Sequence, residues 1–108
     1  MKILKFLLIS FFVSITISVN TFADEAKMKK GLEIFNETAG CAACHVLKAA
    51  GSEGNIGPNL DTVSMTIESV TDMVTNGLGV MPAFGEGEIL TKEEIDIVSY
   101  YVVNAAGK

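Results

Sequence analysis

The sequence Cys-Ala-Ala-Cys-His at residues 41–45 constrains the fold most, because its three reactive side chains must converge on one site. This C-x-x-C-H spacing is typical of covalent attachment of c-type haem. Two thiols three positions apart lie on one side of a helical turn, so both can reach one flat macrocycle and form thioethers with its vinyl groups. His45 follows directly, and its imidazole can turn to the iron from one face.

Two other chemistries are open to the same residues. A Cys-x-x-Cys redox dithiol expects a βαβ surround, and the sequence has no strand pattern near Cys41 and Cys44. A structural zinc site needs about four nitrogen or sulfur ligands, whereas the chain has two cysteines and one histidine. Both comparisons favour one covalently bound haem per chain over a dithiol or a zinc site.

Several further motifs resemble those of the class I c-type cytochromes, nearest to the small soluble single-haem kind. They span nearly all of the chain after residue 23: Gly31 and Phe35, residues 41–45, Gly57-Pro58-Asn59-Leu60, Asn76-Gly77, Met81-Pro82-Ala83-Phe84, and Tyr101. The resemblance implies an all-α cytochrome c fold, with three to four helices and loops wrapped around one covalently bound haem c. It also implies that the first and last helices cross near Gly31, Phe35 and Tyr101.

The resemblance further implies the roles of the residues around the iron. Cys41 and Cys44 hold the haem and His45 is one axial ligand. A metal-bound histidine usually donates its second N–H to a carbonyl or carboxylate, and by resemblance Pro58 supplies that carbonyl while Leu60 packs on the haem. The single histidine excludes two-histidine ligation by this polypeptide. By resemblance Met81, stiffened by the proline after it, is the second axial ligand, and Met65 is the alternative.

Helical periodicity predicts three helices: residues 24–37, 66–76 and 91–105. Gly31 lowers helix stability, so a close helix contact is its expected compensation. Thr66 can cap the second helix, and Gly77 is placed to end it in a left-handed turn. The buried face of this helix is predicted to hold Ile67, Val70, Met73 and Val74.

The third helix should begin at a capping box, in which Thr91 and Glu94 satisfy each other's free backbone N–H groups. Between the helices, residues 46–56 and 78–88 are rich in glycine and other helix breakers and are predicted as loops. No sheet is expected.

The first residues have the features of a secretory signal. Lys2 and Lys5 precede a stretch at residues 6–19 that is apolar or hydroxylic throughout, and Thr21 and Ala23 are small residues before a cleavage point. A membrane-spanning helix needs about 20 apolar residues, so this stretch is short for an anchor. We predict a signal peptide at residues 1–23 and one domain at residues 24–108, in the periplasm, with an uncleaved anchor as the alternative.

Charge limits the partners of the mature chain. Two of the eight basic residues precede residue 24 and all 13 acidic residues follow it, so the mature charge is −7. This argues against nucleic acid or an anionic membrane as a partner and favours a redox protein with a basic docking rim. We expect a monomer without stable membrane insertion after cleavage.

The resemblance implies a one-electron carrier between redox proteins. With His45 and a methionine on the iron, no axial position is open to a substrate, and no acid–base or nucleophilic set of residues remains, so we expect no enzyme activity. Two alternatives stay open. One is a haem-bearing electron-transfer subunit of a specific oxidoreductase complex. The other is a haem module that binds or senses a small ligand.

Overall fold

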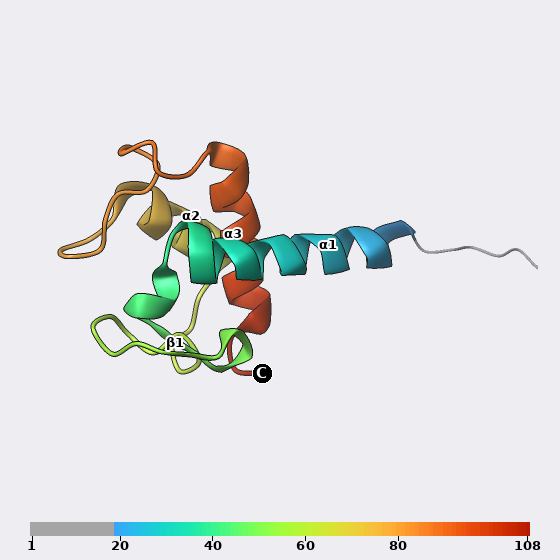
Figure 1. The fold of residues 1–108 in the computed structure, drawn as a ribbon, viewed down its shortest axis with the longest axis horizontal. Coiled ribbons are helices and arrows are strands. Elements are labelled where there is room, and N and C mark those ends of the chain that lie inside the picture. The colour runs from blue at the N-terminus through green and yellow to red at the C-terminus, as the bar shows by residue number, and fades with distance from the viewer. Residues whose placement is uncertain (1–18) are drawn as a thin grey trace, which may run out of the picture.

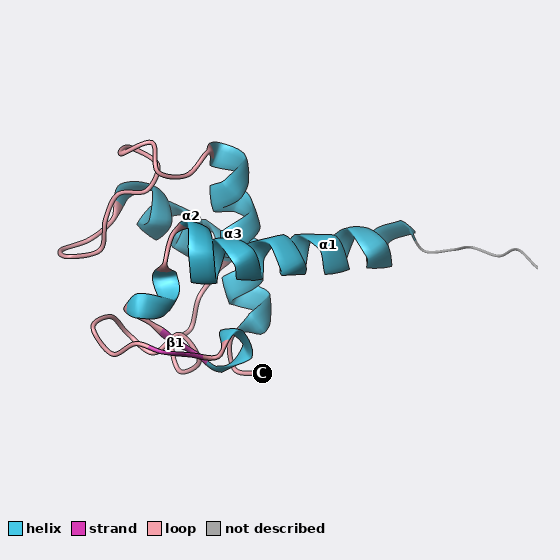
Figure 2. Cartoon of the chain, in the orientation of Figure 1, coloured by secondary structure: helices cyan, strands magenta, loops and turns pink. Residues whose placement is uncertain are grey.

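In the computed structural model, residues 19–108 are described, and most of the predicted signal lies outside them. Three α-helices dominate, joined by short helical turns and one small hairpin (Figures 1 and 2). Their bounds are α1 Val19–Glu33, α2 Ile67–Asn76 and α3 Lys92–Ala105, with β1 at Val46–Leu47 and β2 at Ser52–Glu53. The all-α class is confirmed. No helix within residues 19–108 is both long and apolar enough to cross a membrane.

The core forms where α1 crosses α3 (Figure 1), as the resemblance implied. A Cβ atom at Gly31 would overlap Tyr101 Cβ and lie 2.8 Å from Tyr101 Cγ, so the two backbones approach more closely than a larger residue permits. The Phe35 and Tyr101 rings pack with centroids 6.1 Å apart. The predicted crossing at these three residues is therefore confirmed, and the close contact explains the helical glycine.

The α1–α3 contact continues outside the core through Tyr100, a residue without a predicted role. Its hydroxyl donates to the Asp24 carboxylate at 3.3 Å, and Lys27 Nζ lies 4.2 Å from the centre of its ring. A cation over an aromatic face adds about 0.5–1 kcal/mol at an exposed site. Residue 24, the predicted first residue of the mature chain, is thus held against α3.

The first helix differs from its predicted range of 24–37 at both ends. It begins at Val19, and the regular α-helix stops at Glu33. A π-helical turn, Ile34–Thr38, follows and is closed by the bond from Ala39 N to the Ile34 carbonyl at 2.9 Å. The wider turn lets both Ile34 and Phe35 point into the core, where both are fully buried. Periodicity of 3.6 residues cannot predict such a turn.

Helix α2 begins as predicted, with the Thr66 hydroxyl accepting from Ser69 N at 3.1 Å. It ends at Gly77, which has φ 68° and ψ 177°. The predicted left-handed turn is therefore wrong in detail, because this ψ lies outside the left-handed helical region, in a conformation that is almost confined to glycine. The predicted buried face is narrower than expected: Val70 and Val74 are buried, but Ile67 and Met73 remain 39% and 38% exposed.

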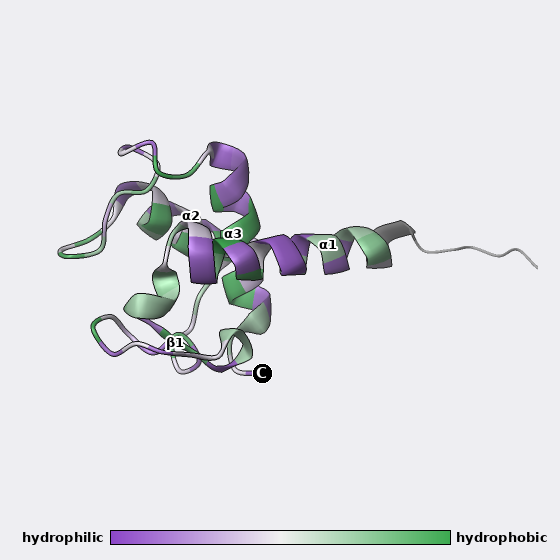
Figure 3. Ribbon diagram, viewed as in Figure 1, coloured by the Kyte–Doolittle hydropathy of each residue, from purple (hydrophilic) through white to green (hydrophobic). Residues whose placement is uncertain are grey.

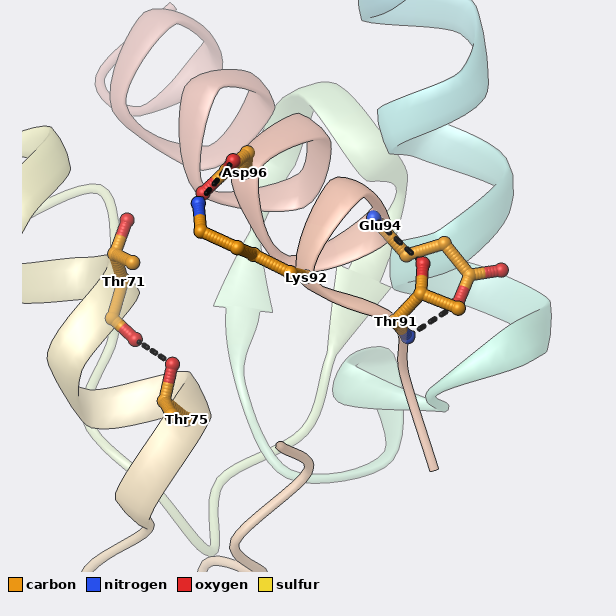
Figure 4. A network of polar contacts seen from close by, with 6 residues as sticks. All are labelled: Thr71, Thr75, Thr91, Lys92, Glu94 and Asp96. Carbon is orange, nitrogen blue, oxygen red and sulfur yellow. Dashed lines mark hydrogen bonds and ion pairs between the residues drawn. The ribbon is translucent and has the colours of Figure 1, made fainter. Parts of the chain in front are cut away.

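Helix α3 begins at the predicted capping box (Figure 4). Thr91 N donates to the Glu94 carboxylate at 2.8 Å, and Glu94 N donates to the Thr91 hydroxyl at 3.2 Å. One turn on, Lys92 pairs with Asp96 at 3.0 Å on the exposed face. The opposite face is buried and mostly apolar, with Ser99 as its one polar exception, and Figure 3 shows the hydrophobic part of α3 where it meets α1.

The expectation of no sheet is wrong in one place. β1 and β2 pair antiparallel, with Val46 opposite Glu53 and Leu47 opposite Ser52. Ser52 is buried, and its hydroxyl accepts from Leu47 N at 2.9 Å, which ties the two strands together by a side chain as well. Two residues per strand are too few to produce an alternating pattern, so periodicity could not reveal this hairpin.

Candidate haem site

The five-residue motif forms one tight turn. Gly40, with φ 67°, ends the preceding segment and allows a 3-10 turn at Cys41–Ala43. The Cys41 carbonyl accepts from both Cys44 N at 3.1 Å and His45 N at 3.0 Å. The turn is closed by these bonds, which hold both cysteines and the histidine close together in one short segment. No disulfide joins Cys41 to Cys44, so both sulfurs can form thioethers.

The environment of Cys41 opposes the dithiol and zinc readings. Burial, with a smaller contribution from the nearby Cys44, raises the pKa of the Cys41 thiol to about 11. Reactive cysteines in redox motifs have lowered pKa values, because the thiolate is the nucleophile and the metal ligand. Within residues 19–108 no group of three or more histidine, cysteine or acidic side chains is arranged to hold a metal ion. The raised pKa therefore argues against a reactive dithiol or a zinc-bound thiolate at Cys41.

His45 is held by a backbone carbonyl. Its Nδ1 lies 2.7 Å from the Pro58 carbonyl oxygen. A carbonyl can only accept, so Nδ1 carries the proton, and in the neutral ring Nε2 keeps a lone pair. A metal-binding histidine is usually fixed in this way, with one nitrogen bonded to a carbonyl and the other directed to the metal. The hydrogen bond thus sets both the tautomer and the orientation of the imidazole.

The segment at residues 54–60, which we call the strap, runs alongside the motif and supplies this carbonyl. Gly57 N donates to the Cys44 carbonyl at 2.7 Å, and Leu60 N donates to the Val46 carbonyl at 3.0 Å. Leu60 itself is partly buried against the core. These bonds fix the strap on either side of Pro58 and so hold the Pro58 carbonyl close to His45.

Gly54 makes the approach of the strap possible, a role that sequence reasoning missed. A Cβ atom there would lie 2.7 Å from the Ala43 carbonyl carbon and oxygen and from the Cys44 carbonyl carbon. Distances this short have no room for a side chain, so the strap can touch the attachment turn only at a glycine. The signal in the sequence was a pair of glycines three positions apart, directly before the proline.

Asp61 secures the far end of the strap and was also missed. Its carboxylate accepts from Lys48 N at 2.9 Å and from Gly107 N at 2.8 Å, and its own N–H donates to the Asn59 side chain at 2.9 Å. The two backbone N–H donors hold the pKa of the Asp61 carboxyl below its usual range. One exposed side chain thus joins the segment after His45, the strap and the C-terminus.

Met81 lies in a loop that is fixed at three points. Leu78 and Met81 exchange backbone hydrogen bonds at 3.2 and 3.0 Å, which closes a tight turn over Gly79 and Val80. After it, Phe84 is buried, and Phe84 N donates to the Val74 carbonyl of α2 at 3.0 Å. Before it, a Cβ atom at Gly77 would lie 2.5 Å from the Met81 carbonyl oxygen. The loop is therefore held against the C-terminal end of α2.

The strap and the Met81 loop lie on the side of the molecule away from the projecting end of α1 (Figure 1). Both segments expose large apolar side chains: Val80 is 85% exposed, Leu78 70% and Ile56 67%. Met81 and Met65 are each partly buried and pack against the core. Which of these two methionines is the distal ligand stays a prediction.

The residues present fit a haem c group. Two cysteine side chains lie in one turn, an imidazole is oriented by a carbonyl with one nitrogen left for a metal, and Met65 and Met81 are both partly buried against the core. These are the ligand types found on haem iron in cytochromes c. The fit rests on the donor set and on the bonds that hold it in place.

Known proteins agree with this fit. The family model described as cytochrome c oxidase, cbb3-type, subunit III matches residues 26–102. Cytochrome c6 of Pyropia yezoensis is 36% identical, with 95% of this chain and 91% of the relative covered. Cytochrome c6 of Leptolyngbya boryana is 37% identical over 72% of this chain and 92% of its own.

A solved structure extends the comparison to the fold. The crystal structure of the c-type cytochrome SorU from Sinorhizobium meliloti matches with a TM-score of 0.71 at 49% identity, covering 78% of this chain and 95% of that one. At this identity the likeness covers the sequence as well as the fold. The chain therefore belongs to the class I c-type cytochromes and carries a covalently bound haem c.

Proposed function

We propose that this chain is an exported one-electron carrier whose single haem c is attached to Cys41 and Cys44 and ligated by His45 and Met81. The observation that carries the proposal is the hydrogen bond from His45 Nδ1 to the Pro58 carbonyl at 2.7 Å. This bond orients the imidazole and leaves its Nε2 lone pair for a metal, as is usual for a histidine that binds one. Because the chain belongs to the c-type cytochromes, the metal is the iron of haem.

The bound haem supplies one-electron chemistry at its iron. The protein's part is to keep the ligands still, since an electron moves fastest when neither ligand has to rearrange. The strap holds His45 through Pro58, and the closed turn at residues 78–81 with Pro82 after it holds the Met81 backbone. Two occupied axial positions leave no site for a substrate, so transfer of electrons, rather than catalysis, is the proposed role. His/Met ligation raises the reduction potential.

The choice of distal ligand is tested with Met81→Ala and its matched control Met65→Ala. The oxidised wild type should show a weak sulfur-to-iron absorption band in the far red. We expect Met81→Ala to lose this band, to bind imidazole or carbon monoxide, and to have a lower potential, while Met65→Ala keeps all three wild-type properties. The opposite pattern would identify Met65 as the ligand and contradict this part of the proposal. If the unmodified wild type binds carbon monoxide readily, the ligand-sensing alternative is favoured.

The docking surface is proposed on the exposed apolar residues of the Met81 loop. Leu78 and Val80 protrude there, the sequence from Thr75 to Gly85 is uncharged, and the exposed acids Glu86 and Glu88 follow. An apolar centre with an acidic border favours a partner that carries a basic rim, because opposite charges speed the encounter.

Salt dependence tests this partner chemistry. The rate of electron transfer to the physiological partner should fall as ionic strength rises, because the Debye length shrinks from about 10 Å at 0.1 M to about 3 Å at 1 M. The double variant Glu86→Gln/Glu88→Gln should weaken the salt dependence without changing the absorption spectrum. A rate that stays flat or rises with salt would show that opposite charge does not guide the encounter.

Export is proposed from residues 1–23, which would place the mature domain, residues 24–108, in the periplasm as a monomer. The mass of the purified protein tests this directly. We expect a chain that begins at Asp24 and carries one haem. A mass that includes residues 1–23 would favour the uncleaved anchor instead.

A second candidate is an electron-transfer subunit of one oxidoreductase. The description of the matching family model, an oxidase subunit, favours it. A subunit should copurify with its complex in fixed stoichiometry through size exclusion at moderate salt, whereas a carrier should elute alone at the mass of one chain. This measurement separates the two candidates without any substitution.

A further inference from the structure

Gly57 lies directly against the His45 imidazole. A Cβ atom built on Gly57 would be 2.5 Å from His45 Cε1, 2.9 Å from Nδ1 and 3.0 Å from Nε2. An atom that approached Cε1 in the plane of the ring would be much farther from the two nitrogens than from Cε1. The near equality of the three distances therefore places this Cβ position, where Gly57 has only a hydrogen atom, over the flat face of the ring.

Residue 57 is a glycine because there is no room for a side chain, and not because its backbone conformation requires a glycine. Gly40, Gly51, Gly77, Gly79 and Gly107 have positive φ angles, which favour glycine for conformational reasons, and Gly57 is not among them. An L-residue could adopt the Gly57 backbone but could not fit its Cβ beside the imidazole. The reason for a glycine at this position is thus the histidine ring itself.

The Gly57 backbone is also unable to withdraw from the ring. Its N–H donates to the Cys44 carbonyl at 2.7 Å, and the next residue accepts from His45 Nδ1 at 2.7 Å. A methyl group at residue 57 would have to tilt the ring or break one of these two bonds. The strap therefore restricts the orientation of the imidazole in two ways: through the hydrogen bond at Nδ1 and through steric contact with one face of the ring.

We propose that Gly57 is a positioning residue that sets the tilt and rotation of the His45 imidazole plane, and so the orientation of the axial ligand field at the iron. This inference rests on the proposed function, in which His45 is an axial ligand. It adds a residue that is neither an attachment cysteine nor an iron ligand but that determines how the imidazole is presented. Side-chain volume at residue 57 then alters the orientation of the His45 ring, because groups that contact a metal ligand fix how that ligand faces the metal.

The test compares Gly57→Ala with Gly31→Ala in the haem-loaded protein. Gly31→Ala introduces a clash of the same kind, against Tyr101 at the helix crossing, and thus controls for lost stability. We expect Gly57→Ala to shift the electron paramagnetic resonance g-values of the ferric protein and to speed hydrogen exchange at His45 Nδ1. Gly31→Ala should lower the unfolding midpoint but keep both signals at wild-type values. Wild-type g-values and exchange in Gly57→Ala would overturn the proposal.

A measurement on the wild type keeps the proposal testable if Gly57→Ala matures poorly. In the ferrous protein, the Gly57 Hα protons should show a nuclear Overhauser effect to His45 Hε1 and an upfield ring-current shift. If the wild type shows neither the Overhauser effect nor the upfield shift, the proposal is overturned. A wild type without the far-red band would instead contradict His/Met ligation, so failure of the Gly57 inference and failure of the proposed function are distinguishable.

Discussion

Replacing Gly31 by alanine sets two effects of similar size against each other. Alanine is favoured over glycine inside a helix by roughly 1 kcal/mol. Adding a methyl group to a filled core costs about 1–3 kcal/mol, and occasionally more. Here the added Cβ would overlap Tyr101 Cβ and lie 2.8 Å from its Cγ and 3.2 Å from the Ile97 carbonyl oxygen. Tyr101 Cβ is bonded to the α3 backbone and the Ile97 oxygen is part of it, so these two atoms move only if the helix moves.

The steric cost therefore belongs near the top of its range, and we expect Gly31→Ala to lose about 2 kcal/mol of unfolding free energy after the helix gain is counted. For a domain of this size that corresponds to a fall in Tm of about 8–16 °C. Urea denaturation of the ferric protein, followed by circular dichroism, measures it. Lys29 lies on the exposed face of α1, so the difference in stability between Lys29→Gly and Lys29→Ala measures the helix propensity of alanine over glycine without a steric contribution. A Gly31→Ala variant as stable as the wild type, or more stable, would refute the reasoning.

Three further predictions concern the cap of α3, Asp61 at the end of the strap, and the attachment turn at residues 41–45. Thr91→Ala should lose about 1 kcal/mol of stability because it removes the bond from Glu94 N, whereas Thr91→Ser should keep most of it; equal losses would contradict a capping role. Asp61 has a lowered pKa, so the stability that it contributes is present at neutral pH and disappears as pH falls through the folded-state pKa. Asp61→Asn should accordingly lower the urea midpoint at neutral pH, and the difference from wild type should vanish in acid; a constant difference would be contrary evidence. Cys41→Ala and Cys44→Ala should each sharply reduce the yield of protein that keeps haem on a denaturing gel, and haem that acid–acetone extracts from the wild type would disprove covalent attachment.

The features that the sequence predicted well are local ones or ones with a family motif. The caps at Thr66 and Thr91 follow from residues three positions apart, so a short stretch contains all the information. The crossing at Gly31 and Tyr101 joins distant residues, and only the resemblance made it predictable. Without the resemblance, the sequence indicated this crossing only by a glycine inside a predicted helix.

The features that sequence reasoning missed depend on long-range partners or on short elements. Asp61 accepts from Gly107, 46 positions away in the chain, and nothing in either local sequence indicates the other. The π turn after Glu33 and the β1–β2 hairpin are too short to leave a periodic pattern. The contact of Gly57 with His45 needs coordinates as well, because a glycine before a proline is equally consistent with an ordinary turn.

The crossing of α1 and α3 also bears on the order in which this protein is assembled. The two helices come from opposite ends of the chain, and such a non-local contact forms late because the intervening chain must first be brought together. Synthesis completes the turn at residues 41–45 long before Tyr101 is available to pack on Gly31. During that interval Cys41 lacks the burial that it has in the finished fold. We therefore expect haem to attach while the chain is still open, before α1 and α3 pack against each other and bury Cys41.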